Sequence, residues 1–372
     1  MKQSKIWLHH SIYIPPLSPA CRMCAKGSKM VVLITGKCSS KCYYCPLSFH
    51  KAGTDKIFAD EWELKNEHDT DILLREAESI HASGAGITGG DPLLVWRRTQ
   101  AYITLLKKTF GDTFHIHLYT SGLKNAAHLP EIVAAGLDEV RFHPMPSTWN
   151  KMEESPLKKI IRRMVQTAVD VAIEIPVIPK KDKEILSLIS WADTEGIQWV
   201  NLNELEYSER NVQAFTSRGY QVKSDVSAAV KGSEATARKI LSMVEQKGVN
   251  VGVHYCSVSF KDGVQLRNRL IRRAHHIAQP YDVITKEGTL IKGVIDHSYI
   301  SLQQTLSLLT ETYHVPTHLC FIDLEKNRIE IAAWLLEKIA SNLVHHGYHC
   351  YIVEEYPTAD RLEVERTPMP SL

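Results

Sequence analysis

The sequence lacks the features of a membrane protein, a secreted protein or a repeat protein. No run reaches the roughly 18 consecutive apolar residues that a membrane-spanning helix needs, and the opening segment MKQSKIWLHH has no apolar core of a secretion signal. Internal repeats and low-complexity segments are absent, and the formal net charge is only +2, which neither requires nor excludes a polyanionic partner. We therefore expect a folded cytoplasmic protein with no membrane partner.

The composition is that of an ordinary globular protein with one unusual feature, its cysteines. The 372 residues are 44% apolar and 23% charged, and this length suits one large domain with a smaller one. Five of the eight cysteines come before residue 50. Such clustering indicates a reducing compartment and metal binding rather than disulfide bonds.

Two interpretations of the clustered cysteines compete. Cys21 and Cys24 form one Cys-x2-Cys pair and Cys42 and Cys45 form another, which is the spacing of a structural zinc ribbon that leaves Cys38 unused. Alternatively, Cys38, Cys42 and Cys45 act together. Three thiolates in one short loop can hold three irons of a [4Fe–4S] cluster and leave the fourth iron open to another ligand.

Apolar, β-branched runs alternate with helical patterns through the first two-thirds of the chain. The runs predicted as strands are residues 30–35, 85–88, 114–120, 138–143, 171–178 and 197–203. Six strand–helix units in succession predict a parallel sheet with helices outside it, here an open or partial (β/α)6 barrel. Barrels of this kind carry their function at the carboxyl ends of the strands.

The cysteine loop follows the first predicted strand, so it opens on that functional face. It contains no hairpin turn of the kind that a zinc ribbon uses, which favours the open-cluster interpretation. Thr120 and Ser121 follow the third strand and suit a ribose. The other predicted strand ends carry Gly89-Gly90-Asp91-Pro92, His143, Glu174 and Asn203. Glycines let a backbone approach a ligand closely, although a tight turn explains the glycine pair as well.

Three of these motifs resemble the signatures of the radical S-adenosylmethionine superfamily. Cys38-x3-Cys42-x2-Cys45, with Tyr44 before the last cysteine, resembles its cluster motif. GGDP resembles its Gly-Gly-Glu-Pro motif, with Asp91 where the superfamily usually has Glu, and YTSG resembles its ribose-contacting strand end. More narrowly, segments such as CRMCAKGSKMVVLITGKC and HYCSVSFKDGVQLRNRL resemble a mainly archaeal group described as related to pyruvate formate-lyase activating enzyme.

This resemblance implies an activity and a set of binding residues. A [4Fe–4S] cluster on Cys38, Cys42 and Cys45 would bind S-adenosylmethionine at its open iron. An external electron donor would drive cleavage to a 5′-deoxyadenosyl radical, which takes a hydrogen atom from the substrate. The backbone of the glycine loop, rather than the Asp91 side chain, would bind the methionine amino group. The residues expected at the S-adenosylmethionine site are Tyr44, Gly89, Gly90, Asp91, Pro92, Thr120, Ser121, His143, Glu174 and Asn203. No catalytic residue beyond these is identified.

The remaining cysteines allow a second metal site. Cys21, Cys24 and Cys256 are candidates for an auxiliary iron–sulfur cluster or a zinc ion, with His254 as a possible fourth ligand. The alternative is that Cys256 is a buried thiol and that the Cys-x2-Cys pair has no partner. Cys320 and Cys350 lie in apolar runs and are expected in the core.

The expected domain organisation has three parts. Residues 1–29 form an N-terminal extension with the Cys-x2-Cys pair, residues 30–278 form the barrel and a following basic segment, and residues 279–372 form a small α/β domain for which a ferredoxin-like fold is considered. In this last domain we predict a hairpin, a helix from Leu302 to Thr312, a strand, a helix from Ile329 to His346 and a final strand.

The substrate is the least determined feature of the sequence. The basic segment QLRNRLIRRAHH is suited to phosphate binding, which favours modification of RNA, with tRNA as the leading candidate. Modification of a peptide or protein, including glycyl-radical activation, is the alternative. A metal-binding or electron-transfer protein without chemistry of its own is a third, and the GGDP and YTSG motifs argue against it because a carrier needs no S-adenosylmethionine pocket.

Overall fold

The computed structural model describes residues 2–296 and 301–370, which form two compact units. The first unit runs to Glu78 and from Ala82 to Leu266, and the second contains residues 79–81 and the chain from Arg267 onward. The division therefore falls earlier than the expected 278/279 boundary. Helix α10 (Arg267–Ile277) belongs to the second unit, where its Arg273 guanidinium donates to the backbone carbonyl of Pro357.

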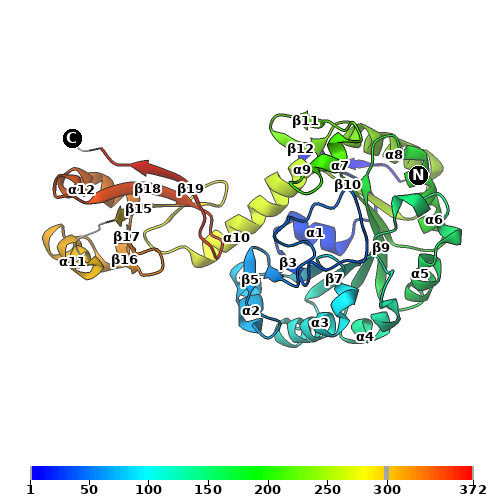
Figure 1. Ribbon diagram of the computed structural model, residues 1–372, viewed down its shortest axis with the longest axis horizontal. Helices are drawn as coiled ribbons and strands as arrows, with labels where there is room; N and C mark the ends of the chain where they lie inside the picture. The colour runs from blue at the N-terminus through cyan, green and yellow to red at the C-terminus, as the bar shows by residue number, and fades with distance from the viewer. Residues whose placement is uncertain (1, 297–300, 371–372) are drawn as a thin grey trace. The chain divides into compact units, whose positions relative to one another are not determined.

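A large, mainly parallel sheet forms the centre of the first unit (Figure 1). Its parallel strands among the described residues are, in spatial order, β13 (Gly252–Cys256), β10 (Trp199–Glu204), β9 (Asp170–Val177), β8 (Glu139–Phe142), β7 (His115–Thr120), β6 (Gly84–Thr88) and β3 (Lys29–Leu33). The six predicted strands are all present, and β13 adds a further parallel strand beside β10. The expected α/β barrel architecture is thus confirmed.

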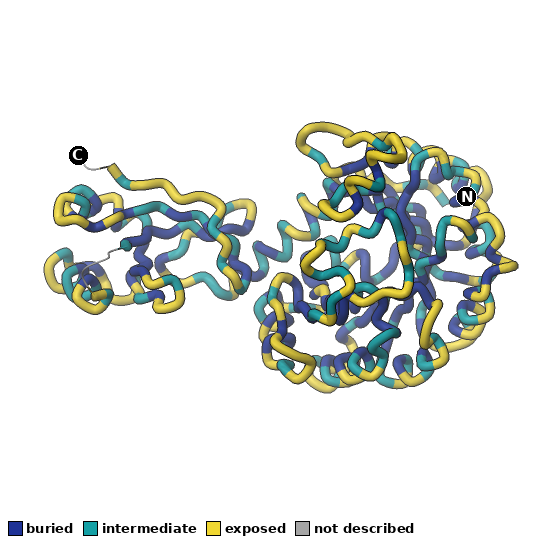
Figure 2. The backbone as a smooth tube through the Cα atoms, viewed as in Figure 1, coloured by how far each residue is buried: buried dark blue, intermediate teal, exposed yellow. Residues whose placement is uncertain are grey.

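Helices cover the outer face of this curved sheet, as Figure 1 shows. They are α2 (Thr70–Ser79), α3 (Trp96–Phe110), α4 (Leu129–Ala134), α5 (Leu157–Val165), α6 (Asp182–Thr194) and α8 (Ser233–Lys247). Shorter elements between the main strands and helices are β4 (Ile57–Ala59), β5 (Trp62–Leu64), α7 (Val212–Thr216), β11 (Val222–Ser224), β12 (Ser227–Val230) and α9 (Val258–Phe260). Figure 2 shows the parallel strands as mostly buried tubes, because helices pack on their outer face. No helix in the described ranges combines the length and apolarity that a bilayer crossing requires.

The N-terminal residues are built into the first unit. β1 (Lys5–Ile6) pairs with β2 (Ile12–Ile14), and β2 pairs antiparallel with β13 at the edge of the large sheet. Helix α1 (Pro19–Ala25) packs against β3, β6 and β7. Proline at the first turn and a Ser18 side chain that accepts from the Ala20 N–H start this helix. The Cys-x2-Cys pair therefore lies inside the barrel unit.

The second unit has the β-α-β-β-α-β order of a ferredoxin-like fold. Its elements are β15 (Leu290–Asp296), α11 (Leu302–Ser307), β16 (Cys320–Asp323), β17 (Arg328–Ile331), α12 (Ala333–His345) and β18 (His349–Glu355). The sheet order is β16–β17–β15–β18, every neighbouring pair is antiparallel, and β14 (Val283–Ile284) and β19 (Glu363–Pro368) add strands to it. The small α/β domain is thus confirmed.

Two elements of this unit differ from the sequence-based expectation. The helix predicted from Ile329 begins at Ala333, since Arg328–Ile331 forms strand β17. Ile329 and Ile331 face the apolar core while Arg328 and Glu330 alternate with them, which is a strand period rather than a helix period. Strand β19 was not predicted because its sequence, EVERTP, is polar and mostly exposed.

Candidate functional site

A cavity of about 660 Å³ in the first unit brings together almost all of the predicted site residues. Its lining includes the two groups of cysteines, Cys38, Cys42, Cys45 and Cys21, Cys24, Cys256, together with Tyr44, Gly89, Gly90, Thr120, Ser121, His143, Glu174 and Asn203. Asp91 and Pro92 do not line the cavity and lie behind the glycine pair. The cavity is therefore one chamber lined by six thiols, three from the loop after β3, two from α1 and one from β13.

The loop that carries Cys38, Cys42 and Cys45 is closed at its base by backbone hydrogen bonds. The Gly36 N–H donates to the Thr54 carbonyl at 2.9 Å, and the Gly53 N–H donates to the Gly36 carbonyl at 2.8 Å. A Cβ on Gly36 would lie 1.7 Å from the carbonyl oxygen of Lys51, so only glycine fits there. Side chains brace the same base, because Asp55 accepts hydrogen bonds from Thr35 at 2.8 Å and from Arg98 at 2.9 Å.

The three thiols of this loop are accessible from the cavity and have donors beside them. Cys38 is exposed, while Cys42 and Cys45 are half-buried. Arg210 donates to the Cys45 sulfur at 3.4 Å, and the Ser40 N–H donates to the Cys38 sulfur at 3.3 Å. Partial burial raises the pKa of Cys38 and Cys42, so binding of a metal at these positions releases protons.

The donor set of three cysteine thiols in one loop is of the kind that holds an iron–sulfur cluster. Within the described ranges, no three His, Cys, Asp or Glu side chains converge closely enough to hold one metal ion. Each cysteine of a cluster binds a different iron, so the sulfurs stand further apart than around a zinc ion. Cys21 and Cys24 lie in helix α1 rather than in a hairpin knuckle, which removes the structural basis of a zinc ribbon.

Positions 89 and 90 must be glycine because their backbone lies against the start of the cysteine loop. The Gly90 N–H donates to the Thr35 carbonyl at 2.7 Å. A Cβ on Gly90 would lie 2.0 Å from the Lys37 carbonyl oxygen, and a Cβ on Gly89 would lie 2.1 Å from that of Thr35. Gly89 also has a φ of +142°. The close approach that demands glycine is therefore to the chain itself, and the two loops form one connected structure.

The Asp91 carboxylate supports the wall of the cavity from behind. It is fully buried and accepts hydrogen bonds from the Thr120 hydroxyl at 2.8 Å, from the Ser121 hydroxyl at 2.5 Å, and from the backbone N–H groups of Ser121 and Leu93. Both hydroxyls donate their hydrogen to Asp91, so they offer lone pairs to the cavity. A ribose hydroxyl that enters the cavity can donate to them. Pro92 opens the short 3-10 turn after Asp91.

Tyr44 and His143 form a hydrogen-bonded pair that fixes the end of the cysteine loop. The His143 Nδ1 donates to the backbone carbonyl of Glu174 at 2.7 Å, so its Nε2 is the acceptor for the Tyr44 hydroxyl at 2.9 Å. Burial lowers the pKa of His143, which keeps the imidazole neutral, and burial raises the pKa of Tyr44 well above its usual value. Both side chains therefore act as neutral groups in the cavity wall.

Glu174 is held by a polar network across neighbouring strands. It accepts from Arg141 at 2.6 Å, from Asn201 at 3.0 Å and from Asn203 at 2.8 Å. Strand register explains the network, since Glu174 is paired with Asn201, and Asn201 with His254. The interior of this barrel is polar around the cavity. The register of the parallel strands places Glu174, Asn201 and His254 side by side in one row.

Several cavity residues were missed by the sequence analysis, namely Lys29, His117, Arg141, Arg210 and Gln265. His117 is notable because it is 2% exposed and neither ring nitrogen has a hydrogen-bond partner among the described residues. The signal was present in FHIHLYT and DEVRFH, where polar residues alternate with apolar ones. Strands buried on both faces of a parallel sheet are normally apolar throughout, so this alternation predicts a polar interior.

The basic segment that suggested RNA binding is largely engaged within the second unit. Arg272 donates to the backbone carbonyls of Ile80 and His81 at 2.7 and 2.6 Å. Arg273 is buried and donates to the Pro357 carbonyl. These two guanidinium groups hold the fold of that unit together, so they are not free cations as the sequence suggested.

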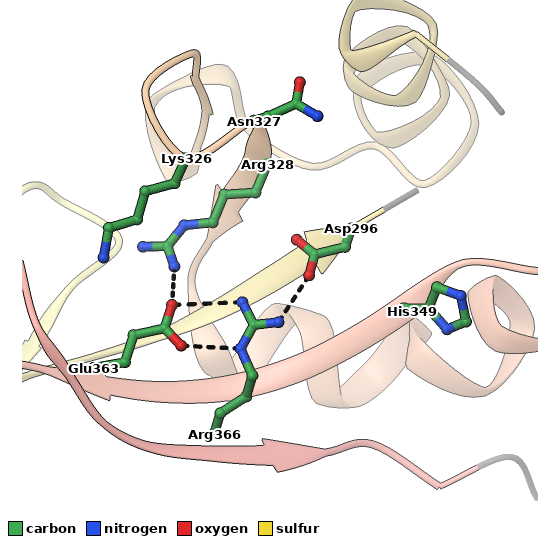
Figure 3. A pocket seen from close by; sticks show the side chains of 7 residues that line it. All are labelled: Asp296, Lys326, Asn327, Arg328, His349, Glu363 and Arg366. Atoms are coloured by element: carbon green, nitrogen blue, oxygen red, sulfur yellow. Dashed lines mark hydrogen bonds and ion pairs between the residues drawn. The ribbon is translucent and has the colours of Figure 1, made fainter. Parts of the chain in front are cut away.

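A second cavity, of about 460 Å³, lies in the second unit and differs in character (Figure 3). Arg366 bridges Asp296 at 2.8 Å and Glu363 at 3.0 Å, and Arg328 donates to the same Glu363 carboxylate at 2.5 Å. Figure 3 shows these side chains directed toward one another. The charges in this cavity satisfy each other.

Comparisons with known proteins agree with this site. A family model described as the radical SAM superfamily matches residues 32–192, and one described as a domain of unknown function matches residues 288–369. A Methanocaldococcus jannaschii protein, provisionally named a glycyl-radical enzyme activating enzyme, is 39% identical over 363 residues, which cover 95% of this chain and 93% of that protein.

Similarity to solved structures is weaker. Streptococcus suis SuiB bound to S-adenosylmethionine matches with a TM-score of 0.44 at 12% identity, over 62% of this chain and 50% of that one. The same protein bound to its precursor peptide SuiA gives a TM-score of 0.44 at 12% identity, over 62% and 48%. The archaeal relative matches almost the whole chain, and the cysteine loop and glycine loop lie inside the matched family region. The chain therefore belongs to the radical S-adenosylmethionine superfamily and is a radical S-adenosylmethionine enzyme, a membership that implies a [4Fe–4S] cluster and S-adenosylmethionine.

Proposed function

We propose that this enzyme takes a hydrogen atom from a peptide or protein, in the manner of an activating enzyme for a glycyl-radical protein. The observation that carries the proposal is the relative with 39% identity over 95% of this chain, whose name describes such an activity. RNA modification, favoured by the basic segment in the sequence, loses part of its support because Arg272 and Arg273, two of the four arginines of that segment, are engaged within the second unit.

Different residues of the cavity would bind the cluster and the ribose of S-adenosylmethionine. Cys38, Cys42 and Cys45 would hold the cluster, which with S-adenosylmethionine and an electron from an external donor supplies the radical. The Thr120 and Ser121 hydroxyls offer acceptors to a ribose. The hydrogen bond between neutral Tyr44 and neutral His143 fixes the far end of the cysteine loop. The wall of the cavity is therefore preorganised for the groups that bind there.

The rest of the chamber is suited to exclude water from a reactive centre. Phe142, Ile173 and Ile175 are fully buried in the strands around it, and the polar groups that face the cavity are mostly held by other side chains. His117 is the exception, with two ring nitrogens available to a substrate amide or carbonyl. A peptide segment offers one backbone donor and one backbone acceptor at nearly every residue, so it can form hydrogen bonds with the His117 ring.

The first test concerns S-adenosylmethionine cleavage. Protein reconstituted anaerobically with iron and sulfide, then reduced with dithionite, should form 5′-deoxyadenosine, and Cys38→Ala should reduce this to the background rate. Cys350→Ala, which removes a buried thiol from the second unit, is the matched control and should retain cleavage. A Cys38→Ala variant with full activity would contradict the assignment of the cluster.

The second test identifies the class of substrate. Protein and RNA fractions are prepared from cells grown with α-deuterated glycine and are supplied separately to the reduced enzyme. Hydrogen abstraction from a glycine residue transfers deuterium into 5′-deoxyadenosine, which mass spectrometry detects. We expect deuterium with the protein fraction and none with RNA. Stimulation of 5′-deoxyadenosine formation by the RNA fraction alone would replace this proposal with RNA modification.

A further inference from the structure

We propose that Cys21, Cys24 and Cys256 bind a second iron–sulfur cluster, at the wall of the cavity formed by α1 and β13. All three line the same cavity as the first group of cysteines, and none forms a disulfide. The two sites are formed by separate segments of the chain. The proposal depends on the thiols and their surroundings, and it holds whichever macromolecule is the substrate.

The first two thiols are presented by a firmly held helix. Cys21 and Cys24 are three residues apart on α1, so they lie on one face of it. Ser18 at the start of α1 donates to the Glu139 carboxylate at 2.8 Å, and Arg141 donates to Ser18 at 3.2 Å. These buried contacts fix α1 to strand β8, so the two sulfurs keep their position in the cavity wall.

Cys256 completes the group from the carboxyl end of β13. It is 4% exposed and is paired in register with Asn203 of β10, another residue of the cavity. On one side it packs against Phe260 and Val264. On the other side Gln265 donates to its sulfur at 3.5 Å. An N–H donor to sulfur is the kind of contact that tunes a bound iron–sulfur cluster.

Basic side chains line the cavity beside the three thiols. Arg141 donates to the Cys21 sulfur at 3.6 Å. Lys29 and Lys261 line the same cavity. Buried thiolates are costly unless cations or a metal compensate them. These side chains are therefore placed to compensate part of the negative charge of a cluster bound at this wall.

The other buried cysteines of the chain show what a structural thiol looks like here. Cys320 and Cys350 lie in the apolar core of the second unit, among residues such as Ile329, Leu336 and Leu343. Neither of these two thiols lines either of the two cavities described above. The contrast argues that the polar, charged surroundings of Cys21, Cys24 and Cys256 serve a ligand.

The chemistry of the site favours a cluster over a zinc ion. A tetrahedral zinc site would need four protein ligands, and His254 is the candidate for the fourth. His254 is not free to be a fourth ligand, since its Nδ1 lies 2.7 Å from Asn201 Oδ1 and its Nε2 lies 3.0 Å from Ser11 Oγ. Three cysteines with no fourth protein ligand suit a cluster with one iron open to the cavity.

The test counts clusters in the whole protein. After anaerobic reconstitution, iron and sulfide are measured by chemical analysis and Mössbauer spectroscopy quantifies the cluster types. Wild-type protein should carry about twice the iron and sulfide of either triple variant, Cys21→Ala/Cys24→Ala/Cys256→Ala or Cys38→Ala/Cys42→Ala/Cys45→Ala. The matched control, Cys320→Ala/Cys350→Ala, should keep the wild-type iron content.

The possible outcomes separate this proposal from the proposed function. Wild-type protein with a single cluster, or with zinc bound in place of the second one, overturns the proposal even if S-adenosylmethionine cleavage is normal. Two clusters in a protein that does not act on any protein fraction support it while contradicting the proposed substrate. If the triple variant at Cys21 does not fold, the Mössbauer count on wild-type protein decides, and Cys24→Ser alone should alter the spectrum of one cluster only.

Discussion

The barrel interior of the first unit and the charged sheet face of the second unit differ in how completely their buried polar groups are paired. In the second unit Lys292 is 3% exposed and pairs with Glu355 at 2.8 Å and with Asp282 at 3.0 Å. Arg328 is 1% exposed and pairs with Glu330 at 2.6 Å and with Glu355 at 2.8 Å. These two buried cations therefore have their counter-charges within the same unit.

The barrel interior leaves groups unsatisfied. Both nitrogens of His117 lack hydrogen-bond partners among the described residues, and six cysteine thiols line the same cavity without a disulfide. Native structures seldom leave buried polar groups unpaired, so an unpaired group in a cavity usually has a ligand as its partner. The comparison teaches that the second unit pairs the buried charges of its sheet internally, whereas the barrel cavity keeps an unpaired imidazole and six thiols beside space that a ligand can fill.

The largest predicted effect breaks the barrel site while sparing the second unit. Gly90→Val introduces a Cβ that would lie 2.0 Å from the Lys37 carbonyl oxygen, and it therefore displaces both loops. We expect loss of S-adenosylmethionine binding by calorimetry together with loss of cluster iron. Gly219→Ala strains the backbone locally, since the φ of Gly219 is +71°, but no atom lies within 4 Å of the added Cβ, so this control should keep both. Lost binding with normal iron content would contradict the coupling of the two loops.

The reciprocal prediction breaks the second unit while sparing the barrel. Lys292→Met leaves buried Glu355 and Glu330 without one of their cations. Loss of one partner from a buried ion pair typically costs about 3–5 kcal/mol. We expect much faster amide hydrogen exchange in peptides from β15 and β18, with unchanged exchange in β6 and β7. Lys338→Met, beside the exposed ring of Trp334, is the control and should have little effect. Equal destabilisation of both units would show that they do not unfold separately.

Acid should weaken the second unit through Glu355. Burial acts to raise its pKa, but Lys292, Arg328 and Arg361 outweigh burial and lower the pKa to about 2. A carboxylate with a lowered native pKa contributes stability that is fully present above its unfolded value of 4.5 and is lost as the pH falls toward 2. Hydrogen exchange in β18 should therefore accelerate across this window. Glu355→Gln should flatten that dependence, and an unchanged dependence would contradict the assignment.

The smallest predicted effect sharpens the description of the barrel wall. Tyr44→Phe removes the hydroxyl that donates to His143 at 2.9 Å and leaves a buried acceptor unpaired. The expected cost is about 1–3 kcal/mol in the stability of the first unit, measured by urea unfolding. Tyr43→Phe, whose hydroxyl makes only a 3.4 Å contact with Tyr220, should cost less. Equal losses of unfolding free energy would show that the Tyr44–His143 hydrogen bond stabilises the first unit no more than the Tyr43–Tyr220 contact does.

Much of this molecule follows from local sequence pattern. The parallel strands were predictable because apolar runs and helical periods alternate, and the cluster loop because Cys38, Cys42 and Cys45 share a short spacing after a strand. The polar side chains of the barrel interior could be predicted from the sequence only in part. Arg141 has no motif around it, and its role depends on contacts with Ser18 and Glu174, which are 123 and 33 positions away in the chain.

Other features were beyond reach because they depend on distant partners. The basic segment predicted cations that are free to bind phosphate. Arg273 is instead buried and donates to the Pro357 carbonyl of the same unit, 84 positions away in the chain. The requirement for glycine at position 90 was predictable, but its cause was not. The cause is the Lys37 carbonyl, and only the folded backbone places it there.

The pairing of β2 with β13 has a consequence for how the enzyme is made. Ser11 lies 3.0 Å from His254, a residue 243 positions later in the chain. On the ribosome, therefore, the N-terminal strand has no edge to join until the segment around Cys256 has emerged, by which time Cys38 and its glycine-loop support are long exposed. Cys256 thus emerges long after the other five cysteines of the cavity, so the proposed second cluster could be completed only late in synthesis.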